Sequence, residues 1–164
     1  MEAIAQRAGV SKVTLYKWWP NRAALVMDAF MDYGSSVLPY PSPMTAAQVQ
    51  RQLGRMAQEF KGSTGRVVAE LMAEAQYDDD VRTAFRDGYV KAKRQEGIRL
   101  IRSAIDAGVL RDVDPDIALD LMYAPLYFRL LVGHGPLTSD FVENHAKLVW
   151  RALAADSASV EEPE

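Results

Sequence analysis

The chain has 164 residues, 49% apolar and 25% charged, which is the balance of an ordinary globular protein able to bury a sizeable core. It contains no cysteine, which excludes a disulfide framework, a thiolate metal site and a cysteine nucleophile. Residues 1–26 hold four basic side chains against one acidic, whereas the remainder holds fifteen basic against twenty-one acidic, so a basic head precedes an acidic body.

Three short helices are predicted at the N-terminal end of the chain. Gly9 ends the first, Ser11 can cap the second, and Asn21 can cap the third after a break at Pro20. Their expected ranges are 1–8, 12–18 and about 22–35. Prolines 39, 41 and 43 then stand at every second position, which excludes a helix and indicates a stiff, extended boundary.

The body after this boundary is also predicted to be helical. Thr45 and Gln48 form a capping box, the aspartates 78–80 suit the start of a long helix ending near Ala107, and Asp114-Pro115 is a strong start signal. No segment alternates as a strand does. We therefore expect an all-α protein of about eight helices, with a head at residues 1–38, a body at 45–155 and a disordered tail at 156–164.

The head carries the most informative pattern. Two short helices separated by Gly9, Val10 and Ser11 are typical of a helix-turn-helix, whose second helix lies in the DNA major groove. With Leu15 facing inward, the outward side chains include hydroxyls and ammonium groups for phosphates, and methyl groups for thymine. The candidate DNA-binding residues are Lys12, Val13, Thr14, Tyr16, Lys17, Trp18 and Arg22.

These residues belong to a longer string with fixed spacing. It reads Ile4-Ala5-x-x-Ala8-Gly9-Val10-Ser11-Lys12-x-Thr14-Leu15-Tyr16-x-x-Trp19-Pro20-Asn21-Arg22-x-x-Leu25. This string closely resembles the DNA-binding helices of TetR-type transcriptional regulators, and residues 107–116 and 124–131 resemble the C-terminal domain of one TetR subgroup more loosely. The resemblance implies a ligand-responsive repressor that binds a pseudo-palindromic DNA operator as a homodimer and is released by a small molecule.

One departure from the family concerns the start of the chain. TetR-type heads have three helices, and the first precedes the pair found here, so the head is expected to be truncated. Either the sequence is truncated, or the start codon was placed late, or the protein lacks that helix. The last possibility leaves an alternative function, a helical dimerisation or small-molecule-binding protein with a vestigial head that does not bind DNA. Translating the genomic DNA upstream of Met1 separates these readings.

Methionine and aromatic side chains recur through the body at helical spacing, and their first role is to form the core. The resemblance also implies a cavity among the body helices, and adaptable walls of this kind suit an apolar effector. The candidate cavity residues are Met56, Phe60, Met72, Phe85, Tyr89 and Tyr123.

The last two predicted helices, about 115–132 and 139–155, are apolar around more of their circumference than one buried face requires. The resemblance independently implies that these helices pair in a dimer, although burial within one monomer would explain the same pattern. The candidate interface residues are Tyr123, Leu126, Leu130, Leu148 and Trp150.

The sequence offers no catalytic or metal-binding cluster and implies no cofactor. His134 and His145 lack acidic partners at metal-ligand spacing, and a structural or solvated role is expected for both. An enzyme is therefore not expected. No apolar run is long enough to cross a bilayer and the N-terminus lacks a signal peptide, so a cytoplasmic protein without a membrane partner is expected.

Overall fold

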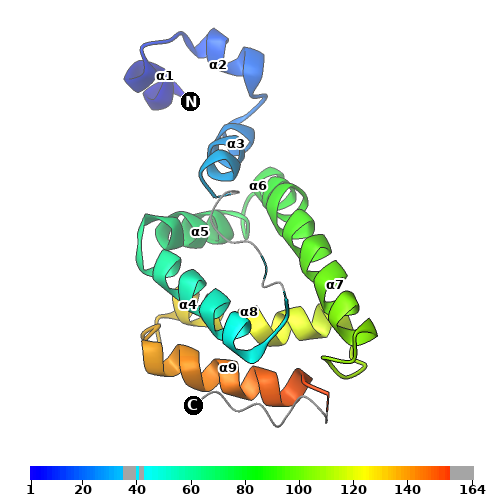
Figure 1. Cartoon of the computed structure of the whole chain (residues 1–164). Helices are drawn as coiled ribbons and strands as arrows, with labels where there is room; N and C mark the ends of the chain where they lie inside the picture. Colours follow the sequence, from blue (N-terminus) through cyan, green and yellow to red (C-terminus); the bar gives the residue numbers. More distant parts are fainter. Residues whose placement is uncertain (35–39, 41–42, 156–164) are drawn as a thin grey trace.

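The computed structural model describes residues 1–34, 40 and 43–155, and every regular element in these residues is helical (Figure 1). This confirms the all-α class. The elements are α1 (Glu2–Ala8), α2 (Lys12–Trp18), α3 (Arg22–Gly34), α4 (Ala46–Lys61), α5 (Ser63–Glu74), α6 (Asp79–Phe85), the π-helical turn η1 (Arg86–Val90), α7 (Lys91–Asp106), α8 (Pro115–Val132) and α9 (Ser139–Leu153). Most of the predicted extended boundary and the whole predicted disordered tail lie outside the described residues.

Side-chain caps fix several helix starts where the sequence predicts them. The Asp114 carboxylate accepts the Asp116 N–H at 2.8 Å, and Pro115 occupies the first position of α8. The Thr45 hydroxyl accepts the Gln48 N–H at 3.2 Å at the start of α4. The Gln48 side chain does not complete the predicted capping box, because its oxygen accepts from Arg51 at 3.3 Å instead.

The long helix predicted before Ala107 is helical from Asp79 to Asp106 but contains a π-helical turn. Asp78 caps α6 by accepting the N–H groups of Asp80 and Val81 at 2.9 and 3.1 Å. The chain then widens into the π-helical turn η1 before continuing as α7. The sequence analysis missed this insertion, although the extra residue of a π-turn shifts the apolar positions that follow it around the helix.

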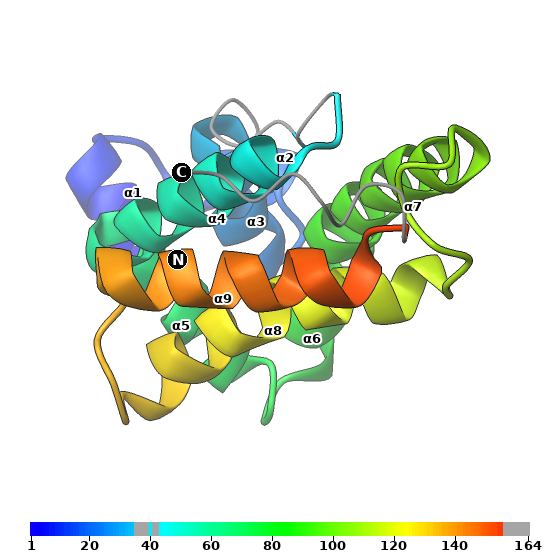
Figure 2. The same ribbon diagram turned by 60° about the horizontal axis from the view of Figure 1, so that its bottom comes forward.

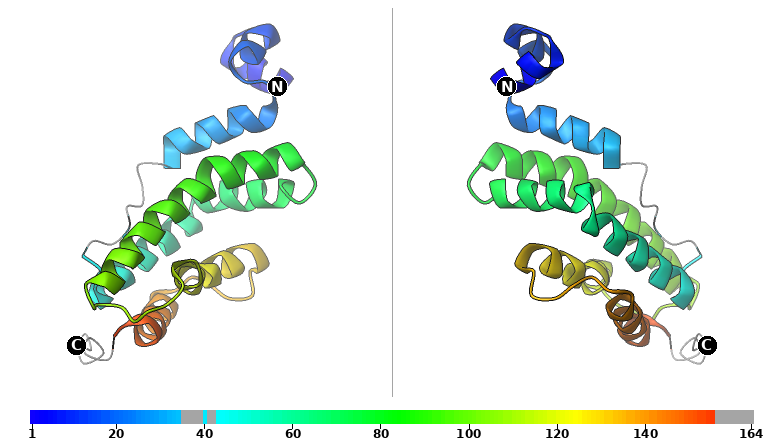
Figure 3. Two further views of the ribbon diagram at one scale, coloured as in Figure 1. Left: turned by 90° about the vertical axis from the view of Figure 1, so that its right-hand side faces the viewer. Right: turned by 90° about the vertical axis from the view of Figure 1, so that its left-hand side faces the viewer.

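The helices stack in layers around α4, which packs against α9, α5 and α8. Figure 1 shows α1 and α2 at one end of the molecule and α9 at the other. Figure 3 shows α3 lying across the layer that contains α5 and α7, with α8 and α9 beyond it. One buried cluster runs through these layers and includes Met27 and Phe30 of α3, so this helix belongs to the core of the body as well as to the head.

The junction between α4 and α5 depends on a glycine. Gly65 is buried in the first turn of α5, and a Cβ built there would lie 2.1 Å from the Phe60 carbonyl oxygen. No real Cβ approaches a backbone oxygen so closely, so any side chain forces the two helices apart. Glycine at this position therefore sets how tightly the chain turns between α4 and α5.

We expect Gly65→Ala to lower the free energy of unfolding by about 1–3 kcal/mol, the range for forced overpacking in a well-packed site. Urea denaturation followed by circular dichroism measures the change. Gly54→Ala in α4 is the matched control, because its Cβ would meet only Val142 at 3.9 Å; that variant should be as stable as the parent or more so. Equal stability of the two variants would contradict the steric argument.

Candidate functional site

The turn between α1 and α2 is held by a glycine and a cap. Gly9 adopts the left-handed conformation with φ of 67°, which ends α1 at low cost only for glycine. The Ser11 hydroxyl then accepts the Thr14 N–H at 3.1 Å, and the two hydroxyls lie 2.8 Å apart. The Thr14 hydroxyl is thus occupied in the cap, which leaves its methyl group as the part available to a partner.

The side chains predicted to contact DNA lie on the open side of α2. Leu15 is buried with Ala5 of α1, as expected for the inward face. Val13 is 79% exposed and Trp18 is 71% exposed, and both values are high for apolar side chains. Lys12, Tyr16 and Lys17 are also exposed. These residues form one accessible helix face, which we call the α2 face.

Two of the predicted cations already have acidic partners. Lys12 lies 3.1 Å from Glu2, and this hydrogen bond raises the pKa of the lysine. Arg22, in the first turn of α3, pairs with Glu74 at the end of α5. In this structure Arg22 therefore ties the head to the body, whereas the sequence suggested a free cation for a phosphate. A neighbouring hydrogen bond joins Asn21 to Asp80 at 3.4 Å.

The body contains a half-open cavity of about 120 Å³ between α4, η1, α7 and α8. Met56, Tyr89 and Tyr123 line it, as the sequence analysis expected. The complete lining is Tyr40, Gln52, Met56, Tyr89, Val90, Lys93, Arg94, Leu119, Tyr123 and Tyr127.

Three residues predicted for the cavity lie elsewhere. Phe60 is buried behind the wall, where its ring meets that of Tyr127 at 5.0 Å. Phe85 packs against Phe30 at 6.3 Å, and Met72 lies against the core. Helical spacing gives the buried side of a helix but not the part of that side that faces this cavity.

The sequence analysis missed Gln52 and Tyr127 although both left a signal. Tyr127 follows Tyr123 by four residues and so shares its helix face. Gln52 is a polar residue within the apolar stripe of α4, and it is only 3% exposed. The Gln52 side-chain oxygen and the Tyr123 hydroxyl are both buried with no hydrogen-bond partner in the described part of the chain. The Gln52 amide is near enough to oppose part of the burial-driven rise in the pKa of Tyr123.

The cavity is electrically neutral. Burial raises the pKa of Tyr40 to about 12, and burial also raises the pKa of Tyr89 and Tyr127, so these hydroxyls stay protonated at neutral pH. Arg94 at the rim bonds to Asp116 and Asp120, each at 2.6 Å. Lys93 lies 3.6 Å from Glu96. The rim cations therefore have counter-ions within the protein.

An aromatic cluster joins the cavity wall to α3. The Tyr89 ring meets the Phe30 ring edge-on at 4.9 Å, and Phe85 completes the group at 5.6 Å from Tyr89. Tyr89 lies in η1, and π-turns within helices are frequent at functional sites. Tyr89 thus lines the cavity and also contacts α3, the helix that carries the head.

The candidate dimer helices present an apolar surface that differs from the predicted one. Leu126 has no exposed surface and Trp150 is also buried, both within their own protomer, so neither is available to a partner in this structure. Tyr123 lines the cavity and Leu130 packs partly against the core. Leu148 is 65% exposed and remains available to a partner.

The exposed apolar residues instead follow one stripe along α8. The stripe consists of Ile117, Leu121, Phe128, Leu131 and Val132, at spacings typical of one helix face. Figure 2 shows α8 beside α9, the helix that carries Leu148. We call this stripe together with Leu148 the α8–α9 face.

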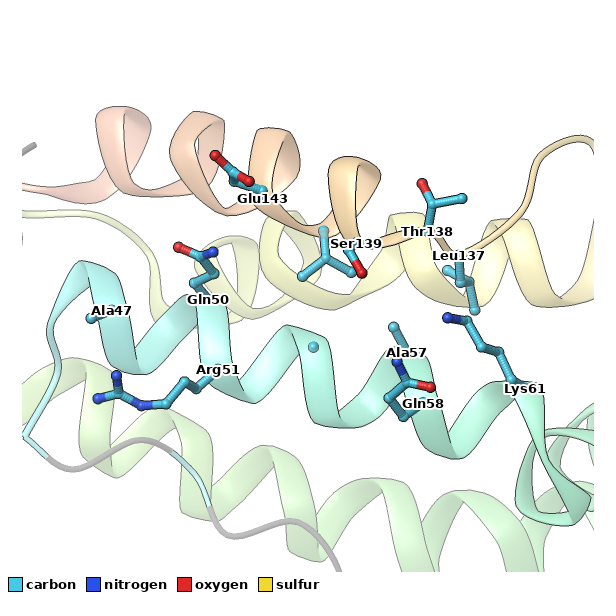
Figure 4. A pocket seen from close by; sticks show the side chains of 12 residues that line it. Ala47, Gln50, Arg51, Ala57, Gln58, Lys61, Leu137, Thr138, Ser139 and Glu143 are labelled. Atoms are coloured by element: carbon cyan, nitrogen blue, oxygen red, sulfur yellow. The ribbon is translucent and has the colours of Figure 1, made fainter. Parts of the chain in front are cut away.

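A second hollow, of about 370 Å³, lies between α4 and α9 (Figure 4). Gly54 and Ala57 are small enough to form its floor, and Lys61, Arg51 and Glu143 surround it. None of the buried unpartnered polar atoms found in the described residues belongs to its lining. It is therefore a weaker candidate for a ligand than the tyrosine-lined cavity.

His145 has a structural role, as the sequence suggested. Its Nε2 lies 2.9 Å from the Met122 carbonyl oxygen, and its ring stacks on Phe141 at 5.7 Å. Residues 1–34, 40 and 43–155 contain no group of three or more potential metal-ligating side chains. Within the same residues no helix combines the length and apolar character needed to cross a membrane.

Comparison with known proteins finds one family match for the head and another for the body. Residues 1–29 match the family of bacterial regulatory proteins of the tetR type, and residues 44–149 match the tetracyclin repressor-like C-terminal domain. The HTH-type transcriptional regulator YdeS of Bacillus subtilis is 30% identical over 97% of this chain and 81% of its own length.

Solved structures share the fold. The TetR family transcription regulator SCO0332 superposes with a TM-score of 0.81 at 32% identity, covering 92% of this chain and 85% of that one. The flavonoid-responsive regulator FrrA superposes with a TM-score of 0.70 at 24% identity, covering 95% and 87%. The chain belongs to the TetR family of bacterial transcriptional regulators.

Proposed function

We propose that the protein represses transcription by binding a pseudo-palindromic DNA operator as a homodimer, and that a small molecule in the tyrosine-lined cavity releases it. The observation that carries this proposal is the double role of α3. Its first turn follows the α2 face and pairs with Glu74, while its Phe30 contacts Tyr89 of the cavity wall. The proposal assigns DNA reading to residues 1–38 and effector binding and dimerisation to 45–155, in a cytoplasmic protein with no enzymatic role.

The α2 face suits the major groove. Val13 and the Thr14 methyl group lie near the start of α2, where a recognition helix meets base edges, and Lys17 lies near its end, where phosphates are contacted. One short helix reads too few base pairs for useful specificity. A two-fold dimer doubles the sequence read, which supports a pseudo-palindromic operator.

The α8–α9 face supplies a surface for that dimer. Its apolar stripe is self-complementary under two-fold symmetry, so each copy can bury the same residues against its partner. Large apolar side chains exposed along one helix in this way mark an interaction surface. Helices α8 and α9 also lie at the end of the molecule opposite α1 and α2 (Figure 1), so a dimer formed through them leaves both α2 faces free.

Tyr89 offers a route from the cavity to the head. A ligand that contacts the Tyr89 ring changes its packing against Phe30, and α3 carries that change toward α2. A ligand shifts the equilibrium only as far as it binds one arrangement more tightly than the other. The effector must therefore favour a position of Tyr89 in which the two α2 faces of the dimer no longer match the operator.

We expect Lys17→Ala to weaken binding to all duplexes and to lower the slope of log affinity against log salt by about one unit per half-site, because one phosphate contact is lost. Fluorescence anisotropy over a series of salt concentrations measures the slope. Arg99→Ala is the charge-matched control, since Arg99 is an exposed cation of α7 in the body. A Lys17→Ala slope equal to that of Arg99→Ala would remove Lys17 from the phosphate contacts.

Val13→Ala should act differently in the same assay. Its exposed methyl groups are placed for base edges, so the salt slope should stay unchanged while the preferred sequence changes. If no duplex binds the parent chain at any salt concentration, the alternative of a vestigial head replaces the proposal.

A further inference from the structure

The size and the lining of the cavity in the body indicate which class of ligand fits it. Its volume of about 120 Å³ is comparable to the roughly 150 Å³ of an apolar cavity known to hold benzene, so the space suits a single ring. Larger polycyclic compounds would require the walls to move.

The walls indicate a flat, aromatic guest. Tyr89 comes from η1, Tyr123 and Tyr127 come from α8, and Tyr40 closes against Tyr123 edge-on at 5.9 Å. Aromatic rings attract one another in offset and edge-to-face arrangements beyond the effect of area alone. Met56 adds a polarizable sulfur, which also contacts ring edges favourably.

Two buried polar atoms indicate where the guest is polar. The Gln52 side-chain oxygen is an acceptor and the Tyr123 hydroxyl can donate, and neither has a partner among the described residues. Leaving buried groups unpaired is costly, so both favour a ligand that pairs them. A single ligand hydroxyl can satisfy both, by donating its proton to Gln52 and accepting one from Tyr123.

The charges around the cavity disfavour an anionic guest. Arg94 is shared between Asp116 and Asp120, and Lys93 lies beside Glu96, so the rim offers no unshared cation to a carboxylate. The remaining polar lining consists of neutral tyrosines and one amide. A charged ligand would lose its hydration without gaining a counter-ion.

We propose that the effector is a small, neutral, monocyclic phenol whose hydroxyl binds between Gln52 and Tyr123. This inference rests on the proposed function only in naming the ligand an effector. Binding itself can be measured on the purified full chain without DNA, so the ligand class and the regulatory role can fail separately.

The test compares three probes of one size by isothermal calorimetry: 4-methylphenol, toluene and 4-methylbenzoate. We expect 4-methylphenol to bind with sub-millimolar affinity, within the range open to so few atoms. Toluene should bind at least tenfold more weakly because both buried groups stay unpaired. Binding of 4-methylbenzoate should be undetectable.

Two variants of α4 test whether the hydroxyl group of the ligand binds at Gln52. Gln52→Leu removes the buried acceptor at similar volume, and it should reduce the preference for 4-methylphenol over toluene to about twofold or less. Gln58→Leu is the matched control, because Gln58 is exposed on the same helix, and it should keep the parent preference. Circular dichroism melting establishes that both variants are folded.

Other outcomes overturn the inference. Equal affinities for 4-methylphenol and toluene in the parent chain would remove the role of the hydroxyl, and tighter binding of 4-methylbenzoate would remove the requirement for neutrality. Failure of all three probes would overturn the ligand class while leaving DNA binding intact. If 4-methylphenol binds as expected but leaves operator affinity unchanged, the ligand class stands and the effector role fails.

Discussion

Phe128→Arg yields a folded monomer that no longer binds its operator with useful affinity. Phe128 is 58% exposed near the middle of the stripe on α8, and its ring contacts only the neighbouring His134 among the rings of the described chain, at 4.8 Å. The protomer therefore tolerates the change. In a two-fold dimer the substitution places two unpaired charges in the interface, each costing about 2 kcal/mol or more, so the dissociation constant should rise at least about a thousandfold.

Sedimentation equilibrium at micromolar concentration measures this change directly. Tyr77→Arg is the matched control, because Tyr77 is the most exposed large apolar side chain of the described residues and lies in the turn after α5. That variant should remain dimeric. A Phe128→Arg protein that sediments as a dimer would move the interface away from the α8–α9 face.

Leu126→Arg, two residues earlier on the same helix, should instead unfold the protomer. Leu126 has no exposed surface, so an arginine there places a charge in the core without a partner. We expect a loss of more than about 5 kcal/mol, comparable to the entire stability of many domains, and hence no soluble folded chain. Circular dichroism of the purified or refolded variant measures the remaining helix.

The control for this change keeps the core apolar. Leu126→Met nearly conserves volume and should cost less than about 1.5 kcal/mol. A Leu126→Arg chain that stays helical and merely becomes monomeric would show that this residue lies in the interface after all. The two arginine variants together therefore determine which side of α8 faces the protomer and which faces the partner.

The head could be predicted from sequence because its signals are local. Gly9 and Ser11 fix the turn through their own backbone conformation and hydrogen bonds, and the inward Leu15 fixes which side of α2 remains exposed. The pairing of Arg22 with Glu74 could not be predicted in this way, since it joins residues far apart in the chain.

The body could be predicted only in outline. Helix α8 is apolar on both sides, so periodicity could not distinguish buried Leu126 from exposed Phe128. The cavity combines side chains from five separate segments, one of which is the π-turn that carries Tyr89. Gln52 left a signal in the sequence as Tyr127 did, because a polar residue inside an apolar stripe needs a partner that α4 itself does not provide.

The most direct test of the proposed function is the number of chains bound to a DNA duplex selected by this protein from a random library. Native mass spectrometry of the complex gives the stoichiometry, and the enriched sequence gives the symmetry. We expect an inverted repeat whose half-sites lie about one or more whole helical turns apart, with the chains bound in pairs related by two-fold symmetry. Enrichment of no sequence, or a single chain on one unpaired half-site, would contradict the proposal.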